Sequence, residues 1–457
     1  MKYLTIAIVV LFSFNACSTN KIVKTEQIKK KVETPKVEAT EKVTEEKKPE
    51  IGAVPNWAKD AVLYEVNVRQ FSEEGNFAAV EEAIPRLKEM GVDILWLMPI
   101  HPIGIENRKG TEGSYYSVQD YMKVHEDYGT VEDLQRLVKT AQLVDMHVII
   151  DWVANHSAWD NWMVTKHPDW YTLKDGKMVP PVEDWSDVVD LNFDNKEFRA
   201  YMKEAMQYWV NSVGINGFRC DVAEMVPLNF WKETIDELSK IRPLFMLAEA
   251  ENPELHQVGF HATYSWELHH LLNQIAQGKI DVNAIREYLA KNDARFNKAD
   301  YRLNFTSNHD ENSWNGSVFE RMGEAHKCLA ALTYALPGMP LIYSGQEAPM
   351  KEKLAFFEKD PISWNDYSYA RFYQELNELK HKHQSLWNGE SGGDLVEIET
   401  TKPNEVLAFM RVAENDVTLF VFNLSNKEVN IEIKDETFTK KTKLNRLSLK
   451  PWEYKMY

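Results

Sequence analysis

Cysteine is scarce in this chain of 457 residues, which has only Cys17, Cys220 and Cys328. Three cysteines this far apart form neither a disulfide framework nor the paired spacing of a zinc site. Cys220 lies between Arg219 and Asp221, and on a strand its side chain would point away from both. We therefore interpret Cys220 as a small buried hydrophobic residue and not as a catalytic thiol.

Positive charge is also in deficit. The 53 Lys and Arg residues face 70 Asp and Glu residues, for a formal net charge of −17. Nucleic acids and anionic membrane surfaces attract clustered Lys and Arg, so neither is expected as a binding partner. Aromatic residues, by contrast, are abundant, with 14 Trp, 19 Tyr and 20 Phe. Their flat faces suit sugar rings, although we expect most of them in the core.

The apolar run near the N-terminus is too short to span a bilayer as a mature helix. Residues 1–16 start with a basic residue and end at Asn15-Ala16, directly before Cys17. This resembles a bacterial lipoprotein signal peptide, which implies cleavage before Cys17 and lipidation of its thiol. An ordinary secretory signal is the alternative.

Residues 17–55 contain no aromatic residue, and the first one downstream is Trp57. A segment of mostly Lys, Glu, Thr and Val cannot bury enough apolar surface to offset its ordering entropy. We predict a disordered tether, with a helical stalk as the alternative. Together with Cys17 this predicts a lipid-anchored protein of the cell envelope. The periplasmic side is favoured because no acidic run follows Cys17.

From residue 61 onward, apolar strand patterns alternate with helical patterns. We expect eight strands, at residues 62–68, 94–98, 147–153, 217–223, 244–249, 263–266, 303–307 and 341–343. Strands joined by helices form a parallel sheet, and near-continuous apolar strands fit a sheet buried on both faces. Eight of them favour an α/β fold with a closed (β/α)8 TIM barrel at 56–385, including a short inserted loop domain at 157–192 after the third strand.

The C-terminal part changes character after a helix predicted at 369–383. Short alternating strands are expected at 395–399, 406–412, 417–424, 429–433 and 450–456, without helical crossovers. This pattern is typical of antiparallel sheets. It predicts a small antiparallel β-sandwich domain at 386–457.

Polar residues follow the ends of several predicted strands, in sequences such as Asn155-His156, Glu249 and Asn308-His309-Asp310. In a closed barrel the C-terminal strand ends share one face, so these residues are expected to converge. Within 217–223, Arg219 and Asp221 would point the same way, and the cation would keep the carboxylate ionised, as a nucleophile requires. A structural ion pair is the alternative for these two alone.

Sequence blocks at these strand ends occupy residues 151–156, 190–192, 217–223, 247–250, 305–310 and 338–347. In content and order they resemble the α-amylase family of glycoside hydrolases (family 13), and the resemblance covers about residues 57–457. It implies Asp221 as nucleophile, Glu249 as general acid/base and Asp310 as transition-state stabiliser. The chemistry agrees, because retaining glycosidases pair an attacking carboxylate with a proton-donating carboxyl group.

The resemblance also implies substrate contacts for Tyr116, His156, Arg219 and His309, with Tyr115 in place of Tyr116 if the register differs by one. The aromatic residue would stack on the cleaved sugar. Many members of the family have Lys-His three and four positions after the nucleophile. Here the residues at those positions are Glu224 and Met225, which puts a typical endo-acting cleft and one calcium ligand in doubt.

Two other family positions that bind calcium match Asn155 and Asp190, so a structural calcium is one expectation. Glu183, Asp184 and Asp187 would either contribute to it or form a solvated acidic loop. No organic cofactor is expected.

The expected activity is retaining hydrolysis of α-1,4-glucosidic bonds in starch or maltodextrins. The alternatives are an α-glucan transglycosylase, an isomerase or an α-1,6-glucosidase using the same carboxylates; Val222 hints weakly at the last. A non-catalytic sugar-binding lipoprotein on an inactivated barrel is less favoured, because Asp221, Glu249 and Asp310 are all present.

Overall fold

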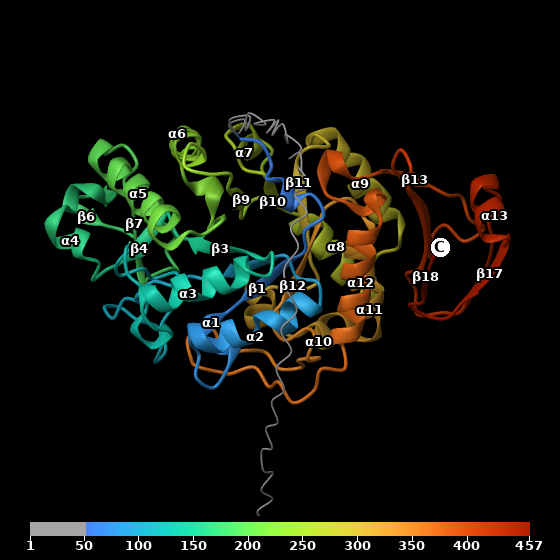
Figure 1. The fold of residues 1–457 in the computed structure, drawn as a ribbon, viewed down its shortest axis with the longest axis horizontal. Helices are drawn as coiled ribbons and strands as arrows, with labels where there is room; N and C mark the ends of the chain where they lie inside the picture. The colour runs from blue at the N-terminus through green and yellow to red at the C-terminus, as the bar shows by residue number, and fades with distance from the viewer. Residues whose placement is uncertain (1–51) are drawn as a thin grey trace, which may run out of the picture. The chain divides into compact units, whose positions relative to one another are not determined.

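A computed structural model describes residues 52–457 of the chain (Figure 1). The expected signal peptide, the lipidation site Cys17 and nearly all of the expected tether lie outside the described residues. Within residues 52–457, none of the helices combines the length and hydrophobicity needed to cross a membrane.

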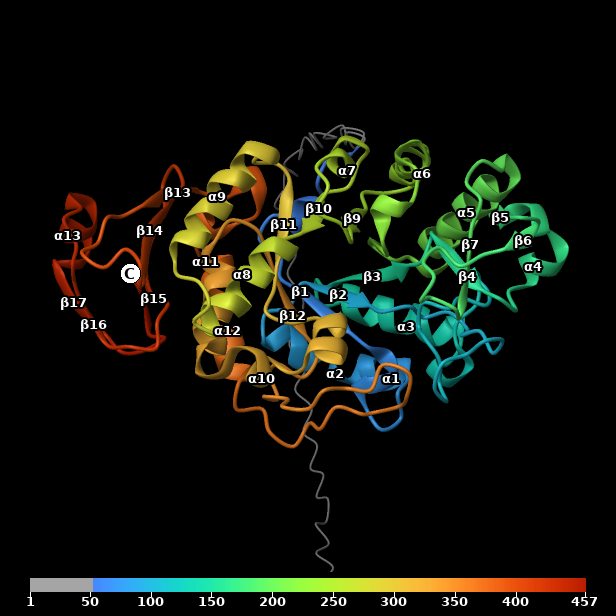
Figure 2. The same ribbon diagram turned by 180° about the vertical axis from the view of Figure 1, so that it is seen from behind.

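Eight parallel strands close into a barrel, which confirms the predicted (β/α)8 architecture (Figures 1 and 2). Around the barrel the order is β1, β2, β3, β8, β9, β10, β11 and β12, and β12 pairs with β1. The strands are β1 (Leu63–Val66), β2 (Ile94–Leu97), β3 (His147–Trp152), β8 (Gly217–Cys220), β9 (Phe245–Ala248), β10 (Ala262–Tyr264), β11 (Tyr301–Asn304) and β12 (Met339–Tyr343). The seventh strand ends before Phe305, earlier than the expected 303–307.

Helices follow the strands and cover the outside of the barrel (Figure 1). The longer ones are α2 (Phe77–Glu89), α3 (Val131–Gln142), α5 (Lys196–Tyr208), α6 (Leu228–Ser239), α8 (Trp266–Ala276), α9 (Asn283–Arg295), α11 (His326–Ala335) and α12 (Ala370–Lys382). Polar N-caps define several starts: Asn76 caps α2, Thr130 forms a capping box on α3 and Asn195 caps α5. The shorter helices around the barrel are α1 (Val68–Phe71), α4 (Trp162–Lys166), α7 (Glu254–Gln257) and α10 (Val318–Met322).

Strand alternation divides the barrel interior into an apolar layer and a charged layer. Leu63, Ile149 and Leu247 point inward and belong to one interior apolar cluster. Two residues after Leu63 and Ile149, Glu65 and Asp151 are also buried, and so is Arg219, which is in register with Asp151 on the neighbouring strand. Because both layers follow the same two-residue period, the charged layer lies closer to the C-terminal ends of the strands, where the functional site of such barrels forms.

The connection after β3 contains two short antiparallel sheets. β4 (His156–Ala158) pairs with β7 (Val188–Asp190), and β5 (Leu173–Lys174) pairs with β6 (Lys177–Met178). In Figure 1 these elements and α4 lie together at the left. They occupy the region where the sequence predicts a short inserted loop domain.

The C-terminal part forms antiparallel sheets, as predicted. One has the order β13 (Asp394–Glu397), β14 (Val406–Val412), β15 (Val417–Asn423) and β18 (Tyr454–Met456), and the other pairs β16 (Val429–Glu432) with β17 (Arg446–Leu449). The expectation of strands alone was wrong here. Helix α13 (Glu436–Thr442), capped by Asp435, lies between β16 and β17. The final strand, expected at 450–456, is shorter in the structure and consists only of β18 at 454–456. Residues 436–442 are too few and too polar to show a clear helical period.

Gly217 begins β8 at φ +155°, and a Cβ atom there would lie only 1.9 Å from the carbonyl oxygen of Phe245 on β9. We expect Gly217→Ala to destabilise the fold by more than about 3 kcal/mol, because the backbone of β9 cannot move aside without breaking the barrel. Thermal unfolding measures this loss.

Gly278→Ala is the matched control, since Gly278 also has positive φ (+66°) but nothing lies within 4 Å of the added carbon. It should cost only about 1–2 kcal/mol of backbone strain. Equal losses in the two variants would contradict the close approach of β8 and β9.

Candidate active site

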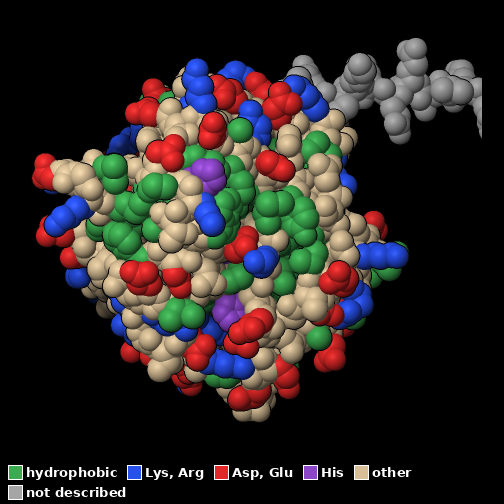
Figure 3. Space-filling view, turned by 90° about the vertical axis from the view of Figure 1, so that its left-hand side faces the viewer, with side chains coloured by type: hydrophobic (Ala, Val, Ile, Leu, Met, Phe, Trp, Pro, Cys, Tyr) green, Lys and Arg blue, Asp and Glu red, His purple; other side chains and the backbone are tan. Residues whose placement is uncertain are grey.

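A cavity of about 400 Å³ lies at the C-terminal ends of the barrel strands. It is lined by Lys109, Ser114, Tyr116, His156, Trp185, Asp187, Val188, Asp221, Val222, Glu249, His309, Asp310, Trp314, Phe356 and Phe357. Figure 3 views the side of the molecule on which β4 and β7 lie in Figure 1. Hydrophobic side chains gather around the centre of this face, with acidic, basic and histidine side chains between them. Acidic groups next to exposed aromatic rings suit a carbohydrate better than an apolar ligand.

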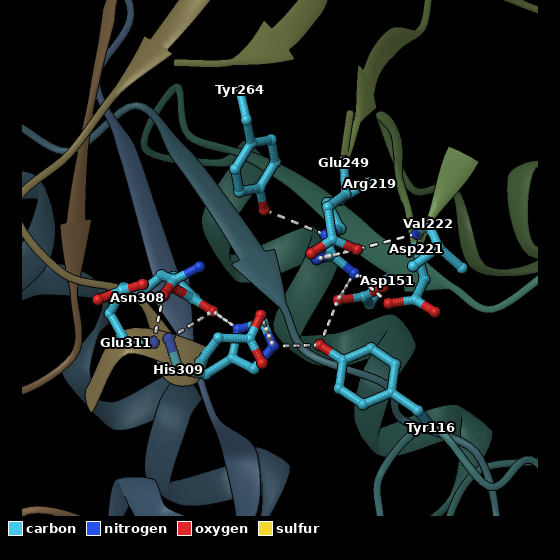
Figure 4. A network of polar contacts seen from close by, with 12 residues as sticks. Tyr116, Asp151, Arg219, Asp221, Val222, Glu249, Tyr264, Asn308, His309 and Glu311 are labelled. Atoms are coloured by element: carbon cyan, nitrogen blue, oxygen red, sulfur yellow. Dashed lines mark hydrogen bonds and ion pairs between the residues drawn. The ribbon is translucent and has the colours of Figure 1, made fainter. Parts of the chain in front are cut away.

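Arg219 is the centre of the charged layer (Figure 4). Its Nη1 lies 3.0 Å from Asp151 Oδ1 and 2.9 Å from Asp221 Oδ1. Its Nη2 lies 3.0 Å from Glu249 Oε2, an ion-pair distance without good hydrogen-bond alignment. Nε donates to the Tyr264 hydroxyl at 3.2 Å. One guanidinium thus organises three carboxylates from three neighbouring strands.

Two expectations about Arg219 need correction. Arg219 is completely buried and does not line the cavity, so it positions the carboxylates and does not contact the substrate. It also does not hold the pKa of Asp221 below its usual range. Burial raises the pKa of Asp221, and Arg219 only opposes this rise. Burial is not visible in the spacing of Arg219 and Asp221, and it also raises the pKa of the neighbouring Asp151 to about 7.

Glu249 follows β9 and is held by a backbone amide next to the predicted nucleophile. The Val222 N–H donates to Glu249 Oε2 at 2.9 Å. Val222 has φ 37° and ψ 47°, the left-handed region that a β-branched residue rarely adopts. This turn directs the amide toward Glu249 and ends β8 just before Asp221. Burial raises the pKa of Glu249, which favours the protonated form that a general acid needs.

His309 connects the opposite wall of the cavity. Its Nδ1 donates to the buried Glu65 carboxylate on β1, and its Nε2 lies 2.7 Å from the Tyr116 hydroxyl and 3.3 Å from Asp310 Oδ2. Burial lowers the pKa of His309, but Asp310 and Glu65 outweigh it and raise the value to about 9. His309 is therefore an imidazolium at neutral pH, with both ring nitrogens donating.

His156 and Asp310 complete the set brought together by the fold. His156 Nε2 lies 4.0 Å from Asp221 Oδ2, and burial lowers the pKa of His156 to about 4, so the ring is neutral and the contact is not an ion pair. The Asp310 side chain is 33% exposed, compared with 10% for Asp221. Asp310 therefore faces the open part of the cavity, where its carboxylate can interact with positive charge on a ligand.

Of the two adjacent tyrosines, Tyr116 lines the cavity and Tyr115 does not. The Tyr115 hydroxyl accepts hydrogen bonds from Asn67 and Arg69 beneath the site. Tyr116 packs between the His309 ring at 5.5 Å and the Phe356 ring at 6.3 Å. These contacts fix the tyrosine ring at the wall of the cavity.

Several residues of the site were missed from the sequence: Glu65, Lys109, Trp185, Trp314, Phe356 and Phe357. Glu65 had a usable signal, because it is the lone charged residue in the apolar stretch Val62–Val66. The others lie on connections between strands and helices, where no periodicity marks a residue that faces a cavity.

The expected calcium ligands do not form a complete site. Asn155 Nδ2 lies 3.3 Å from His156 Nδ1, and the Asn155 backbone carbonyl accepts a hydrogen bond from the Leu191 N–H. Asp190 pairs across β4 and β7 with His156. Among residues 52–457, no group of three or more His, Cys, Asp or Glu side chains is placed to hold a metal. Calcium takes about six to eight oxygen ligands, so these donors do not fit it and no step below involves calcium.

The acidic residues after α4 have different positions. Glu183 and Asp184 are exposed, in line with a solvated acidic loop. Asp187 is buried, lines the cavity and pairs with Lys109. The alternative of a solvated loop is therefore wrong for Asp187.

A closed (β/α)8 barrel with three carboxyl groups around one cavity at its C-terminal face defines a glycoside hydrolase. The model of the alpha amylase catalytic domain matches residues 55–187 and 181–416. The chain belongs to the α-amylase family, glycoside hydrolase family 13.

Its relatives include Alpha-amylase 3 from Dictyoglomus thermophilum, 26% identical, with 87% of this chain and 92% of the relative covered. Alpha-amylase MalA from Haloarcula japonica is 27% identical over 82% of this chain, which spans only 57% of the length of that relative. Among solved structures, a noncanonic maltogenic alpha-amylase, AmyB, from Thermotoga neapolitana is 30% identical, with a TM-score of 0.77 over 83% of this chain and 90% of that chain.

The Glu65–His309 pair generates a pH-dependent prediction. The folded-state pKa of His309, about 9, exceeds the ordinary value of 6.5. The stability that Asp310 and Glu65 provide by keeping His309 protonated is therefore complete below pH 6.5 and is lost as the pH rises through about 9. Glu65→Gln should lower the pKa of His309, measured by NMR titration of labelled histidine. The unfolding midpoint of Glu65→Gln should lie furthest below the wild-type midpoint in the acidic range, and the difference between the two midpoints should narrow above pH 9.

Glu267→Gln provides the control, because it removes a half-buried carboxylate paired with Lys291, far from His309 in the chain. It should leave the titration of His309 unchanged. A gap between wild type and Glu65→Gln that is constant with pH would contradict the charge pairing.

Proposed function

We propose that this protein is a retaining α-glucan hydrolase that cleaves α-1,4-glucosidic bonds of starch or maltodextrins by double displacement. The observation that carries the proposal is the placement of Asp221 and Glu249 on the two terminal nitrogens of Arg219, in the wall of a cavity that also contains Asp310. A retaining mechanism needs two carboxyl groups only about 5–5.5 Å apart, and a shared guanidinium keeps them close.

In the first step Asp221 attacks the anomeric carbon while Glu249 gives its proton to the leaving glycosidic oxygen. The bond from the anomeric carbon to that oxygen breaks, and an ester between the sugar and Asp221 forms. The elevated pKa of the buried Glu249 keeps its proton available. Arg219 stabilises the anionic form of Asp221, which is needed for the attack and is regenerated when the ester is cleaved in the second step.

In the second step Glu249, now a carboxylate, takes a proton from water, and the resulting hydroxide displaces Asp221 from the anomeric carbon. Both transition states carry positive charge on the sugar ring. Asp310 faces the open cavity and offers negative charge there, and Tyr116 offers a ring face for stacking. His309 and His156 both line the cavity, and we propose that they exchange hydrogen bonds with sugar hydroxyls.

Transglycosylation is the second candidate, because the relatives include an alpha-1,4-glucan:maltose-1-phosphate maltosyltransferase from Salinibacter ruber, 28% identical over 82% of this chain and 61% of that protein. The same carboxylates would serve, with a sugar hydroxyl instead of water as acceptor. A sugar-binding role without catalysis is disfavoured, because all three carboxyl groups reach one cavity.

We also propose that the protein is lipid-anchored through Cys17 in the cell envelope, on the periplasmic side. The sequence Asn15-Ala16-Cys17 and the polar segment that follows it support this location. Incorporation of labelled palmitate into wild type, and its loss in Cys17→Ser, would be the expected result. Equal labelling of both proteins would disprove the anchor.

Glu249→Gln should lower the rate of reducing-sugar release from soluble starch by roughly 10²–10⁴-fold, because the leaving oxygen loses its proton donor. The loss should be much smaller for an aryl glycoside whose leaving group needs no proton, and stopped-flow release of that aryl group measures it. Glu254→Gln, an exposed carboxamide variant nearby in the sequence, is the control and should behave as wild type. Similar losses on both substrates would contradict the acid role.

Product analysis on maltohexaose, pullulan and isomaltose, side by side, separates the candidate activities. Hydrolysis of α-1,4 bonds predicts shortened products from maltohexaose and none from isomaltose. Products longer than the substrate would indicate transglycosylation, and glucose from isomaltose would indicate α-1,6 cleavage. Absence of any product would favour the binding protein.

A further inference from the structure

One end of the cavity is crossed by an ion pair that the mechanism does not use. Lys109 Nζ lies 2.9 Å from Asp187 Oδ1 and also donates to the Asp184 carbonyl at 2.8 Å. Both Lys109 and Asp187 line the cavity. The Asp187 side chain is only 7% exposed, and the Ser117 hydroxyl donates to its backbone carbonyl. The pair therefore joins the connection after β2 to the connection after β3.

A second set of contacts joins the connection after β2 to the one after β12. The Glu112 N–H donates to the Phe357 carbonyl at 3.0 Å, and the Thr111 N–H donates to Glu358. A Cβ atom on Gly110 would lie 2.5 Å from Phe357 Cβ, so these two segments are in close contact. The connections after β3, β2 and β12 are thus joined into one rim, in which Lys109 and Phe357 line the cavity.

The barrel order shows which part of a substrate would meet this rim. β9, which Glu249 follows, lies four strands from β1 in either direction, so β9 and β1 are opposite each other. Two of the connections that join at the rim follow β12 and β2, the strands next to β1, and the third follows β3, midway between β1 and β9. Since Glu249 must protonate the leaving oxygen, the leaving saccharide lies on the β9 side. The remaining, glycone part of the chain extends toward Lys109 and Asp187.

The side of the leaving saccharide has no such barrier among the residues that follow β8. Ala223–Met225 form a single turn there, in which Glu224 is exposed and the Met225 side chain is 42% exposed. A long saccharide can leave the cavity on this side. The two ends of the cavity therefore differ in how much chain they admit.

We propose that the Lys109–Asp187 ion pair closes the glycone end of the cavity, so that the enzyme binds the non-reducing end of an α-glucan and releases short saccharides from it. This inference rests on the proposed function. The ammonium and carboxylate groups are charged hydrogen-bond partners for the hydroxyls of the terminal sugar. In a longer chain a further sugar ring would take the place of one of these hydroxyls and would collide with the ion pair. Lys109 and Asp187 then determine product length without taking part in bond cleavage.

The test uses the full-length enzyme on two 4-nitrophenyl maltoheptaosides, one with a free non-reducing end and one whose non-reducing end is blocked by an ethylidene group. Wild type should cleave the free substrate and act on the blocked one at least about tenfold more slowly, since the rim has no room for the block. Lys109→Ala should raise cleavage of the blocked substrate by on the order of tenfold and should release longer saccharides from maltoheptaose. Asp187→Asn should shift the products in the same direction.

Lys123→Ala is the matched control, because it removes an ion pair of the same 2.9 Å length, with Asp120, in the same connection but outside the cavity. It should keep the wild-type product pattern, and thermal unfolding confirms that each variant is folded. Equal rates of wild type on free and blocked substrates would overturn the inference, as would unchanged product lengths in Lys109→Ala. If wild type acts on no α-glucan at all, the proposed function fails first, and this inference with it.

Discussion

The buried guanidinium of Arg219 is the group on which the site depends. Three carboxylates surround it, and a positive charge in this position offsets part of their mutual repulsion inside the barrel. Burial nevertheless raises the pKa of Asp151, Asp221 and Glu249, so the free enzyme holds more protons in this cluster than isolated side chains would. The balance suits a reaction in which one carboxyl group must be protonated and its neighbour must attack.

In the barrel, the residues that pack the core and the residues that form the site occupy different positions along the same strands. Inward residues near the start of the strands form an apolar cluster, and the next inward positions carry Glu65, Asp151 and Arg219. Each charged side chain is therefore supported from below by close-packed apolar groups, which restrict its conformation. Glu65 illustrates the result: it lies on β1, does not line the active-site cavity, and helps to keep His309 charged through a direct hydrogen bond.

The catalytic residues lie at or directly after strand ends, whereas the rest of the cavity is built by connections of different lengths. The connection after β2 contacts those after β3 and β12, while the one after β8 makes a single turn through Glu224 and Met225. Function in a common fold is set by its variable connections, so substrate preference is expected to depend on these loops. In this chain the long connections follow β2, β3 and β12.

By itself, the sequence determined the eight parallel strands and the gathering of Asp221, Glu249 and Asp310, because strand periodicity and the shared face of strand ends are local or topological rules. It did not determine that Arg219 is hidden beneath the carboxylates, nor that burial outweighs its charge on Asp221, since both depend on side chains from other strands. The tertiary structure alone decided that Tyr116 and not Tyr115 faces the cavity and that Asp187 meets Lys109. Those outcomes depend on how irregular connections pack against one another, and no repeating pattern in the sequence encodes that packing.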